Sequence, residues 1–510
     1  MYTVSMDILI RFITLHYRKA FLVLLFCGVC IILLYPVSRL QMNMDDHVHI
    51  YPALLGDYLD HFKGYTHDYG LLRPLALIWF YIVYTIYLIS PAIAHIIPFL
   101  FHIATGYFLY KIVQKHLSFG LSVLVGIAFI VFPFFTEQYG WLAASNASIA
   151  NFILIIQLYT VTLTTWSFQK KLITLFGLQT VGVLLYESVF FTFIAVAYLL
   201  VHEYAVNWRS KKFVLSLALL GAPSLLYVLL RALVFMPRAN FAREMSIGNL
   251  LTENGSVQIF ENVRMVIENL SFLFLAQGMH QSYWMGNIAS GYEQFSQNPL
   301  LVLGVNYFII GCLALLFLTR QTKVSAHWSI DFRSYLFLSI LVLLPGLLLT
   351  SPAFPFRVLA LPLFFLFIGI IVLISKLNQT IAAIILIITI IVSLFISNSI
   401  LNQMRIQAKD DDIGFIMIVE GVNNHIPMSG KAIVVLEGIP NSTQTDVAYG
   451  QYLSSCMSAD WCIQAAINRR TSNITQIVVN PAEEVLKPEG TYLFLFRYDP
   501  ITHRILIQDI

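Results

Sequence analysis

Long apolar runs constrain this chain more than any other feature of its sequence. The first run, at residues 21–40, contains no acidic residue, and several others reach the roughly 20 residues that cross about 30 Å of hydrocarbon as a helix. The chain of 510 residues is 58% hydrophobic, has a mean hydropathy of +0.77 and contains only 11% charged residues. Because soluble domains carry about 25% charged residues, the sequence predicts a polytopic membrane protein with helical spans.

The charge of the chain argues against nucleic-acid binding. Its net charge is +3, and it has neither a basic stripe nor zinc-finger spacing. Lys and Arg instead fall in small clusters between apolar runs, and such clusters mark cytoplasmic loops. Arg18 and Lys19 form the first cluster, which predicts a cytoplasmic N-terminus. The first run lacks a small-residue cleavage site, so we expect it to be retained as an anchor.

Alternation between the basic clusters predicts about eleven spans. The expected spans are residues 20–39, 92–113, 119–136, 147–167, 172–187, 188–207, 213–236, 299–319, 333–351, 356–376 and 379–401. A long outer loop at 237–298 separates the seventh span from the eighth. The segment at 71–89 could span fully or lie in the interface, and its many Tyr and Trp residues favour an interfacial helix in the first outer loop.

The C-terminal stretch at 402–510 has a different, more polar character. The runs KAIVVLEGI and TYLFLFRY are typical of strands. The sequence therefore predicts two domains: an all-α transmembrane domain at 1–401 and a small extracytoplasmic α/β domain at 402–510. Cys456 and Cys462 would face an oxidising space there and could form a disulfide.

Ionisable residues gather on the predicted outer side of the membrane, close to the headgroup level. Ionisable residues near membrane depth are expensive to bury, so they are candidates for function. The candidates are Asp45, Asp46, His47, Arg73, Glu137, Glu187 and Arg357. Their shared side and depth predict a site at the outer face of the membrane.

Each candidate also has a structural interpretation. Asp45 and Asp46 could begin a solvated loop, and Glu137 could be an exposed loop charge. Glu187 could cap a helix, and the two arginines could reach the headgroups as snorkelling anchors. The histidines near the aspartates include metal-ligand types, but the HVH spacing is weak support for a metal, and we expect none.

Carboxylates and arginines on one side of a membrane suit group transfer from a lipid-linked donor. Arginine binds phosphate through two parallel hydrogen bonds, and a carboxylate can act as general base on an acceptor hydroxyl. A leaving phosphate also needs cationic stabilisation. The residues therefore predict transfer of a sugar from a polyprenyl phosphate, whose phosphate lies at the headgroup level.

The order of short motifs over residues 20–200 resembles the GT-C class of integral membrane glycosyltransferases, and more closely the O-mannosyltransferases that carry tetratricopeptide repeats. The family has an acidic pair after helix 1, a W-R-P-L-like segment, a histidine-containing helix, a P-x-x-x-E-x-x-x-W-like block and a K-E-S-like turn. Here these are Asp45-Asp46, LLRPLALIW with Arg73, HIIPFLFHIATGYFLY with His95 and His102, PFFTEQYGW with Glu137, and Tyr186-Glu187-Ser188.

The resemblance implies a GT-C-like fold and a hexosyltransferase that uses a polyprenyl-phosphate sugar as donor. It implies that Asp45 and Asp46 are the catalytic pair, supported in substrate binding by His47, Arg73, Glu137, Glu187 and Arg357. It implies no metal and no cofactor besides the donor. The chain departs from the family because it has no helical repeat domain and has YES in place of KES, so a glycan or glycolipid acceptor fits as well as a protein. A bacterial plasma membrane is the expected location.

Two other functions remain open on the sequence. A glycan polymerase or ligase would rely on arginines in a large outer loop, and Arg238, Arg243 and Arg264 lie in the loop at 237–298. A transporter or flippase for lipid-linked glycans would need ionisable groups along a path through the bilayer. The interiors of most predicted spans lack charge, which disfavours transport.

Overall fold

The structure is a computed structural model of the chain. It describes residues 2–42, 46–47, 50, 63, 73–163, 165–204, 210–231, 233, 332–347, 356–427, 430–437, 460–468, 470–479, 481, 485, 490–499 and 504–508. Several predictions fall outside these residues: the catalytic candidate Asp45, the span at 299–319, and Arg238, Arg243 and Arg264 of the outer loop.

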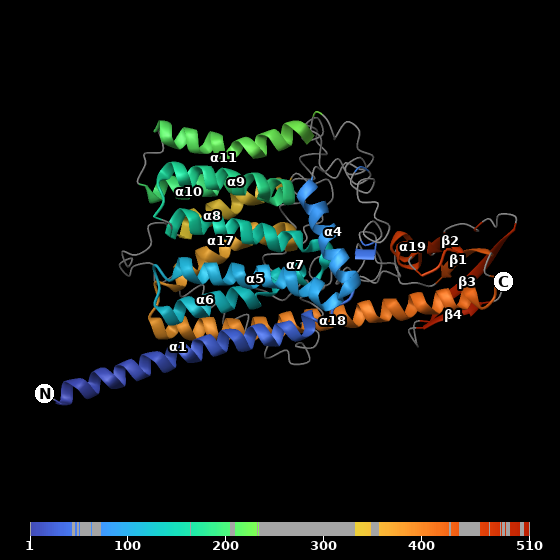
Figure 1. The fold of residues 1–510 in the computed structure, drawn as a ribbon, viewed down its shortest axis with the longest axis horizontal. Helices are drawn as coiled ribbons and strands as arrows, with labels where there is room; N and C mark the ends of the chain where they lie inside the picture. Colours follow the sequence, from blue (N-terminus) through green and yellow to red (C-terminus); the bar gives the residue numbers. More distant parts are fainter. Residues whose placement is uncertain are drawn as a thin grey trace.

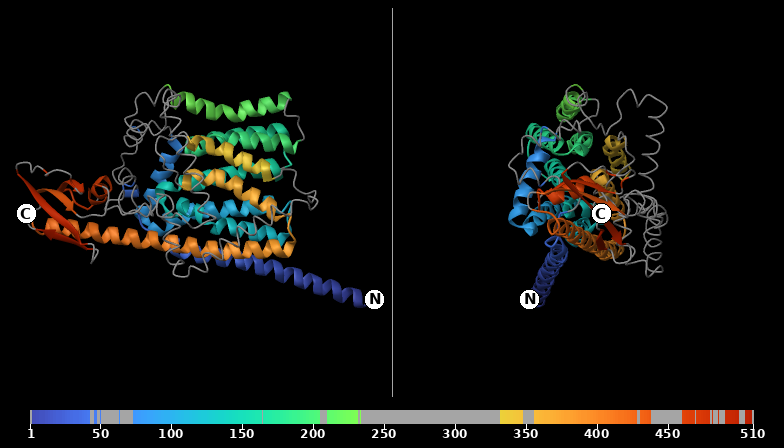
Figure 2. Two further views of the ribbon diagram at one scale, coloured as in Figure 1. Left: turned by 180° about the vertical axis from the view of Figure 1, so that it is seen from behind. Right: turned by 90° about the vertical axis from the view of Figure 1, so that its right-hand side faces the viewer.

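Helices arranged side by side form the main body of the molecule (Figure 1; Figure 2). They are α1 (Tyr2–Val37), α5 (Pro91–Val113), α6 (Phe119–Val131), α8 (Asn146–Leu163), α9 (Phe168–Leu185), α10 (Thr192–Glu203), α11 (Lys211–Leu230), α16 (Phe332–Leu347), α17 (Phe356–Ile374) and α18 (Gln379–Asn423). Serine side chains begin three of them: Ser90, Ser167 and Ser210 accept a hydrogen bond from the backbone N–H three residues later. Such caps satisfy donors that have no partner inside the helix.

Among the described residues, four helical segments are long and apolar enough to cross a membrane. They are Ala20–Val37, Pro91–Val113, Leu142–Thr162 and Lys211–Leu230. Large apolar side chains also face outward from the bundle, such as Phe21 on α1, Ile173 on α9 and Leu225 on α11. Single exposed apolar residues are ordinary on a soluble protein, but rows of them on helices of this length indicate a membrane protein.

Helices α5 and α6 approach each other closely at a pair of glycines. A Cβ atom added to Gly126 would lie 3.0 Å from the carbonyl oxygen of Gly106, and one added to Gly106 would lie 2.6 Å from Ile130. Small residues at helix crossings allow backbones to approach in membranes, where packing drives helix association. The two glycines therefore fix the distance between α5 and α6. The loop that joins these two helices contains Lys115.

Helix α4 (Pro74–Ile89) runs across the ends of the bundle helices instead of parallel to them (Figure 1). It contacts α5, α9 and the short helix η2 (Leu142–Ala144). Pro74 at its first position suits a helix start, because proline has no N–H to satisfy there. At the same end of the bundle the chain forms the short helices η1 (Pro133–Phe135), α7 (Thr136–Gly140) and η3 (Glu187–Val189).

The C-terminal part is a small α/β unit at the far end of α18 (Figure 1). Its sheet has the order β2-β1-β3-β4, formed by β1 (Lys431–Glu437), β2 (Ile474–Val479), β3 (Thr491–Asp499) and β4 (Arg504–Gln508). β1 pairs in parallel with β2 and β3, and β4 pairs antiparallel with β3. Helix α19 (Asp460–Asn468) packs against β2. The two runs predicted as strands are β1 and β3.

Cys462 on α19 is disulfide-bonded, whereas Cys27 and Cys30 are free. Cys456 lies outside the described residues, so its pairing with Cys462 stays a prediction.

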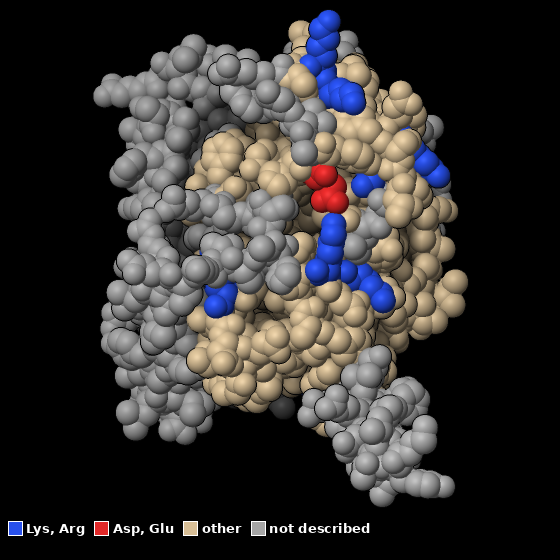
Figure 3. Space-filling model, turned by 90° about the vertical axis from the view of Figure 1, so that its left-hand side faces the viewer, with Lys and Arg blue, Asp and Glu red and all other residues tan. Residues whose placement is uncertain are grey.

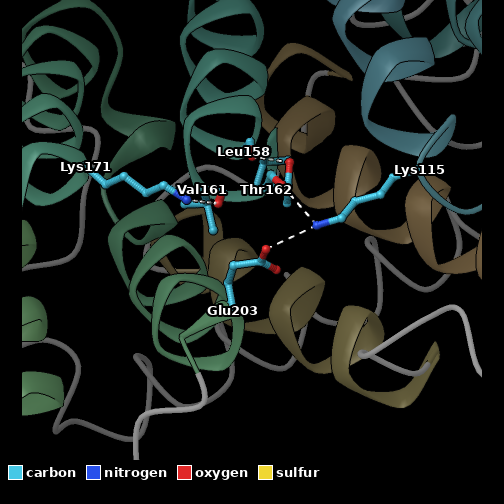
Figure 4. Close-up of polar contacts among 6 residues, drawn as sticks. All are labelled: Lys115, Leu158, Val161, Thr162, Lys171 and Glu203. Atoms are coloured by element: carbon cyan, nitrogen blue, oxygen red, sulfur yellow. Dashed lines mark hydrogen bonds and ion pairs between the residues drawn. The ribbon is translucent and has the colours of Figure 1, made fainter. Parts of the chain in front are cut away.

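The end of the bundle away from α4 carries Lys and Arg side chains around a small acidic patch (Figure 3). Lys115 donates to the carbonyl oxygen of Thr162 at 3.1 Å and forms an ion pair of 3.1 Å with Glu203. Lys171 donates to the carbonyl oxygen of Val161 at 2.6 Å (Figure 4). Both carbonyls belong to the last turn of α8, whose unpaired oxygens and dipole favour cations. The two lysines thus join the ends of α5, α8, α9 and α10.

Candidate functional site

The predicted motif segments meet at the end of the bundle where α4 lies. η1, α7 and η2 follow α6, and η3 follows α9. The start of α17 is at this end too, and α17 contacts η1, α7 and η3, while α4 contacts η2 and α9. Segments that are far apart in the sequence therefore surround one region.

Asp46 is the best defined of the predicted site residues. Its side chain is fully buried. Its Oδ1 atom accepts a hydrogen bond of 2.7 Å from the hydroxyl of Tyr84 on α4 and one of 2.8 Å from the backbone N–H of Ala143 in η2. Hydrogen bonds to a carboxylate are stronger than those between neutral groups, so these two donors fix the position and orientation of the Asp46 carboxyl group.

A second hydrogen bond joins α4 to the segment around η2. The indole Nε1 of Trp79 donates to the hydroxyl of Ser145 at 2.7 Å, and that hydroxyl donates to the carbonyl oxygen of Leu142. Trp79 also packs edge-on against Phe101 of α5. Tyr84 and Trp79 therefore tie α4 to the turn that follows α7, which is the turn that supplies the N–H group for Asp46.

Arg73 lies just before α4 and is half-buried. Its guanidinium carbon is 5.5 Å from the ring centroid of Tyr186, which is a distance typical of a cation–π interaction. Tyr186 directly precedes η3. The structure thus brings the arginine of the RPL motif next to the first residue of the YES motif.

His47 is buried and lies beside a residue from the long helix α18. Its ring meets Phe415 edge-on, with 5.4 Å between ring centroids and an interplanar angle of 83°. Aromatic rings prefer this arrangement. The contact brings the segment after α1 together with a residue that lies more than 350 positions later in the chain.

The two histidines of α5 differ in their surroundings. His102 stacks against Phe129 and Tyr139, and its Nε2 lies 3.0 Å from the carbonyl oxygen of Ile130. These contacts make it a packing residue. His95 is also fully buried; it lies beside the backbone of Gln41, and its ring meets that of Tyr87 edge-on.

Four predicted site residues have no described side chain. Glu137 lies in α7, Glu187 begins η3 and Arg357 lies in the first turn of α17, so their backbones are at the α4 end of the bundle. Asp45 lies outside the described residues altogether.

Sequence reasoning missed Tyr84, the N–H of Ala143, and Phe415. Tyr84 is one of several tyrosines in an apolar helix, and a backbone N–H has no signature in the sequence. Phe415 follows the acidic stretch AKDDD, whose polar character predicts a start of the strand-containing domain and not a buried helix face. Within the described ranges, no group of three or more His, Cys, Asp or Glu residues could hold a metal ion.

Comparison with known proteins gave no match to a family model, to a curated protein or to a solved structure.

Proposed function

We propose that this protein is a glycosyltransferase that moves a sugar from a polyprenyl-phosphate-linked donor to an acceptor hydroxyl at the outer face of a membrane. The observation that carries the proposal is the buried carboxyl group of Asp46, which two hydrogen bonds hold at one end of an apolar helix bundle. The motif order that resembles the GT-C class supports the same reaction.

The reaction would be a single displacement at the anomeric carbon of the sugar. Asp46 would accept the proton of the acceptor hydroxyl as that oxygen attacks. The bond between the anomeric carbon and the phosphate oxygen would break, and the lipid phosphate would leave with the bonding electrons. The product would have inverted configuration. Arg73 lies among the same segments and would stabilise the phosphate charge.

The charge distribution supports an orientation for the chain. Lys115, Lys171 and their neighbours lie at the end opposite Asp46, and cytoplasmic loops are enriched in such residues. The Asp46 end would then face outward, together with the C-terminal unit. In this orientation α4 is the interfacial helix of the first outer loop, and about eleven spans cross the plasma membrane, as the alternation predicts.

The interior around α8, α9 and α10 disfavours the transporter alternative. Within the described part, the buried ionisable side chains are Asp46, His47, His95, His102, Lys171 and Asp411. The deeper polar groups of α8, α9 and α10 are neutral: Gln179 bonds to Gln157 and accepts from Thr192. A relay through the membrane would require ionisable groups along its path.

The test is a transfer assay with purified protein in membranes and a panel of radiolabelled polyprenyl-phosphate sugars. We expect wild type to move label from the lipid to an acceptor or to water. Asp46→Asn should lower that rate at least about a hundredfold, because it removes the general base. Asp45→Asn serves as the paired variant, since it changes the neighbouring carboxyl group in the same way.

Two outcomes would contradict the proposal. One is full activity in both asparagine variants. The other is a wild-type protein that neither turns over any donor nor binds polyprenyl phosphate. A rate that falls in Asp45→Asn but not in Asp46→Asn would keep the reaction and assign the base to Asp45.

A further inference from the structure

Phe415 of α18 contacts both the proposed site and the C-terminal unit. On one hand its ring lies 5.4 Å from that of the buried His47, the residue next to Asp46. On the other, the guanidinium carbon of Arg470 lies 5.4 Å from its ring centroid. Arg470 belongs to the turn between α19 and β2.

Arg470 is held in place by groups from two elements. It forms an ion pair with Asp412, which lies three residues before Phe415 on the same face of α18. Its Nη1 also donates a hydrogen bond of 3.0 Å to the carbonyl oxygen of Ala466 in α19. The planar guanidinium can make these polar contacts while it faces an aromatic ring. The position of Arg470 is therefore set jointly by α18 and by the C-terminal unit.

We propose that the C-terminal unit positions His47 at the site through Phe415 and Arg470. The inference rests on the proposed function, because it assigns to His47 the substrate-binding role in that reaction. Arg470 and Phe415 are positioning residues, since neither would touch the substrate. The donors that hold Asp46, Tyr84 and the N–H of Ala143, come from the bundle and do not involve this contact chain.

This separation of contacts predicts a specific kinetic effect. Loss of the Arg470 contacts should leave the Asp46 carboxyl in place and so leave kcat within about twofold. His47 would lose its fixed orientation, and KM for the lipid-linked donor should rise about tenfold, the size of effect that one hydrogen bond to a charged ligand group gives. A defect in the general base would instead lower kcat.

The test compares four full-length variants in membranes: Arg470→Gln, Arg470→Lys, Phe415→Leu and Arg497→Gln. Arg497→Gln is the matched control, because Arg497 forms an exposed ion pair with Glu437 in the same unit. The first readout is modification of His47 by diethyl pyrocarbonate, located by mass spectrometry, which needs no substrate. The second is KM and kcat for the donor sugar that wild type accepts.

We expect Arg470→Gln and Phe415→Leu to make His47 several-fold more reactive and to raise KM. Arg470→Lys should restore both values in large part, and Arg497→Gln should match wild type. If wild type transfers no sugar yet His47 becomes reactive only in the Arg470→Gln and Phe415→Leu variants, the proposed function fails while the positioning contact is supported.

Three results would overturn the inference. His47 could stay protected in Arg470→Gln, or it could become as reactive in Arg497→Gln as in Arg470→Gln. The third is a rise in His47 reactivity with no change in KM for the donor.

Discussion

Asp46 is held by two partners that lie far from it in the sequence. The carboxyl group itself could be predicted, because two aspartates directly after a long apolar run are conspicuous. Its partners could not: a backbone N–H exists at every non-proline residue, and only the approach of η2 selects that of Ala143. The sequence favours an interfacial helix at α4, but it does not indicate which tyrosine of that helix meets Asp46.

Tyr84→Phe should weaken catalysis without removing the base. The variant deletes the hydroxyl that donates to Asp46 and keeps the buried ring. A hydrogen bond to a charged group contributes about 1.5 kcal/mol or more, so kcat should fall roughly tenfold while KM for the donor changes little. The control is Tyr107→Phe, which removes the hydroxyl of an exposed tyrosine on α5. An unchanged kcat in Tyr84→Phe would mean that the Ala143 N–H alone orients Asp46.

The burial of the Lys171 ammonium group should change how the folding stability of the protein depends on pH. It precedes the predicted span at 172–187 and is only 3% exposed. Burial lowers the pKa of Lys171 below its ordinary value of 10.5; Lys115 lowers it further, and Glu203 opposes the shift. The folded protein therefore releases this proton at a lower pH than the unfolded chain does. Folding stability from this group rises with pH as the pH approaches 10.5.

The comparison that reveals this effect is wild type against Lys171→Met, which has a similar length and no charge. We expect the difference in Tm between wild type and variant to move in favour of wild type as the pH rises from neutral toward 10.5. Thermal unfolding in the same detergent at each pH measures it. A difference that stays constant over this range would contradict the lowered pKa of Lys171.

Among the elements, α18 departs most from what the sequence suggested. The predicted boundary at 401/402 falls inside this helix, which continues to Asn423. Its buried positions repeat with helical spacing: Met404, Ala408, Asp411, Phe415, Ile418 and Val422. The acidic triplet at 410–412 hides this pattern in the sequence, because aspartate side chains are expected to lie in water. In the structure Asp411 is buried and Asp412 pairs with Arg470.

The close crossing of α5 and α6 predicts that Gly126→Ala and Gly177→Ala change Tm in opposite directions. Alanine is favoured over glycine inside a helix by about 1 kcal/mol. Gly177 of α9 has open space around it, so Gly177→Ala should raise Tm slightly. A Cβ at Gly126 would meet the backbone oxygen of Gly106 at 3.0 Å, so Gly126→Ala should lower Tm in spite of its better propensity. If both variants were stabilised equally, the close approach of α5 and α6 would be wrong.

On the scale of the whole molecule, the sequence predicts where the helices lie better than it predicts how they pack against one another. The predicted spans at 92–113, 147–167 and 356–376 coincide within a few residues with α5, α8 and α17, because apolar runs between basic clusters leave few other boundaries. The contacts that assemble the site depend on how distant segments pack. The contact between His47 and Phe415 joins segments near opposite ends of the chain. No local pattern in the sequence indicates this contact.

The two ends of the helix bundle carry chemically different groups. The α4 end has the buried carboxyl of Asp46 and the half-buried Arg73, and it leads to the C-terminal unit. The other end has the exposed Lys115 and the buried Lys171, both bound to carbonyl oxygens in the last turn of α8. A lipid phosphate would find cationic groups at both ends, so phosphate affinity alone does not identify the site. What distinguishes the α4 end is a fully buried carboxyl group held by two neutral donors, whereas Glu203 at the other end is partly exposed and pairs with Lys115.

The most direct test is therefore to locate the bound lipid phosphate. A polyprenyl phosphate with a photoreactive diazirine near its phosphate would be irradiated with the protein in membranes, and the labelled peptides would be identified by mass spectrometry. We predict labels on the segment around Asp46 and on the start of α4, lost when unmodified polyprenyl phosphate competes. Labels concentrated around Lys115 and Lys171, or spread over the outward faces of α1 and α11 without competition, would contradict the assignment of the site.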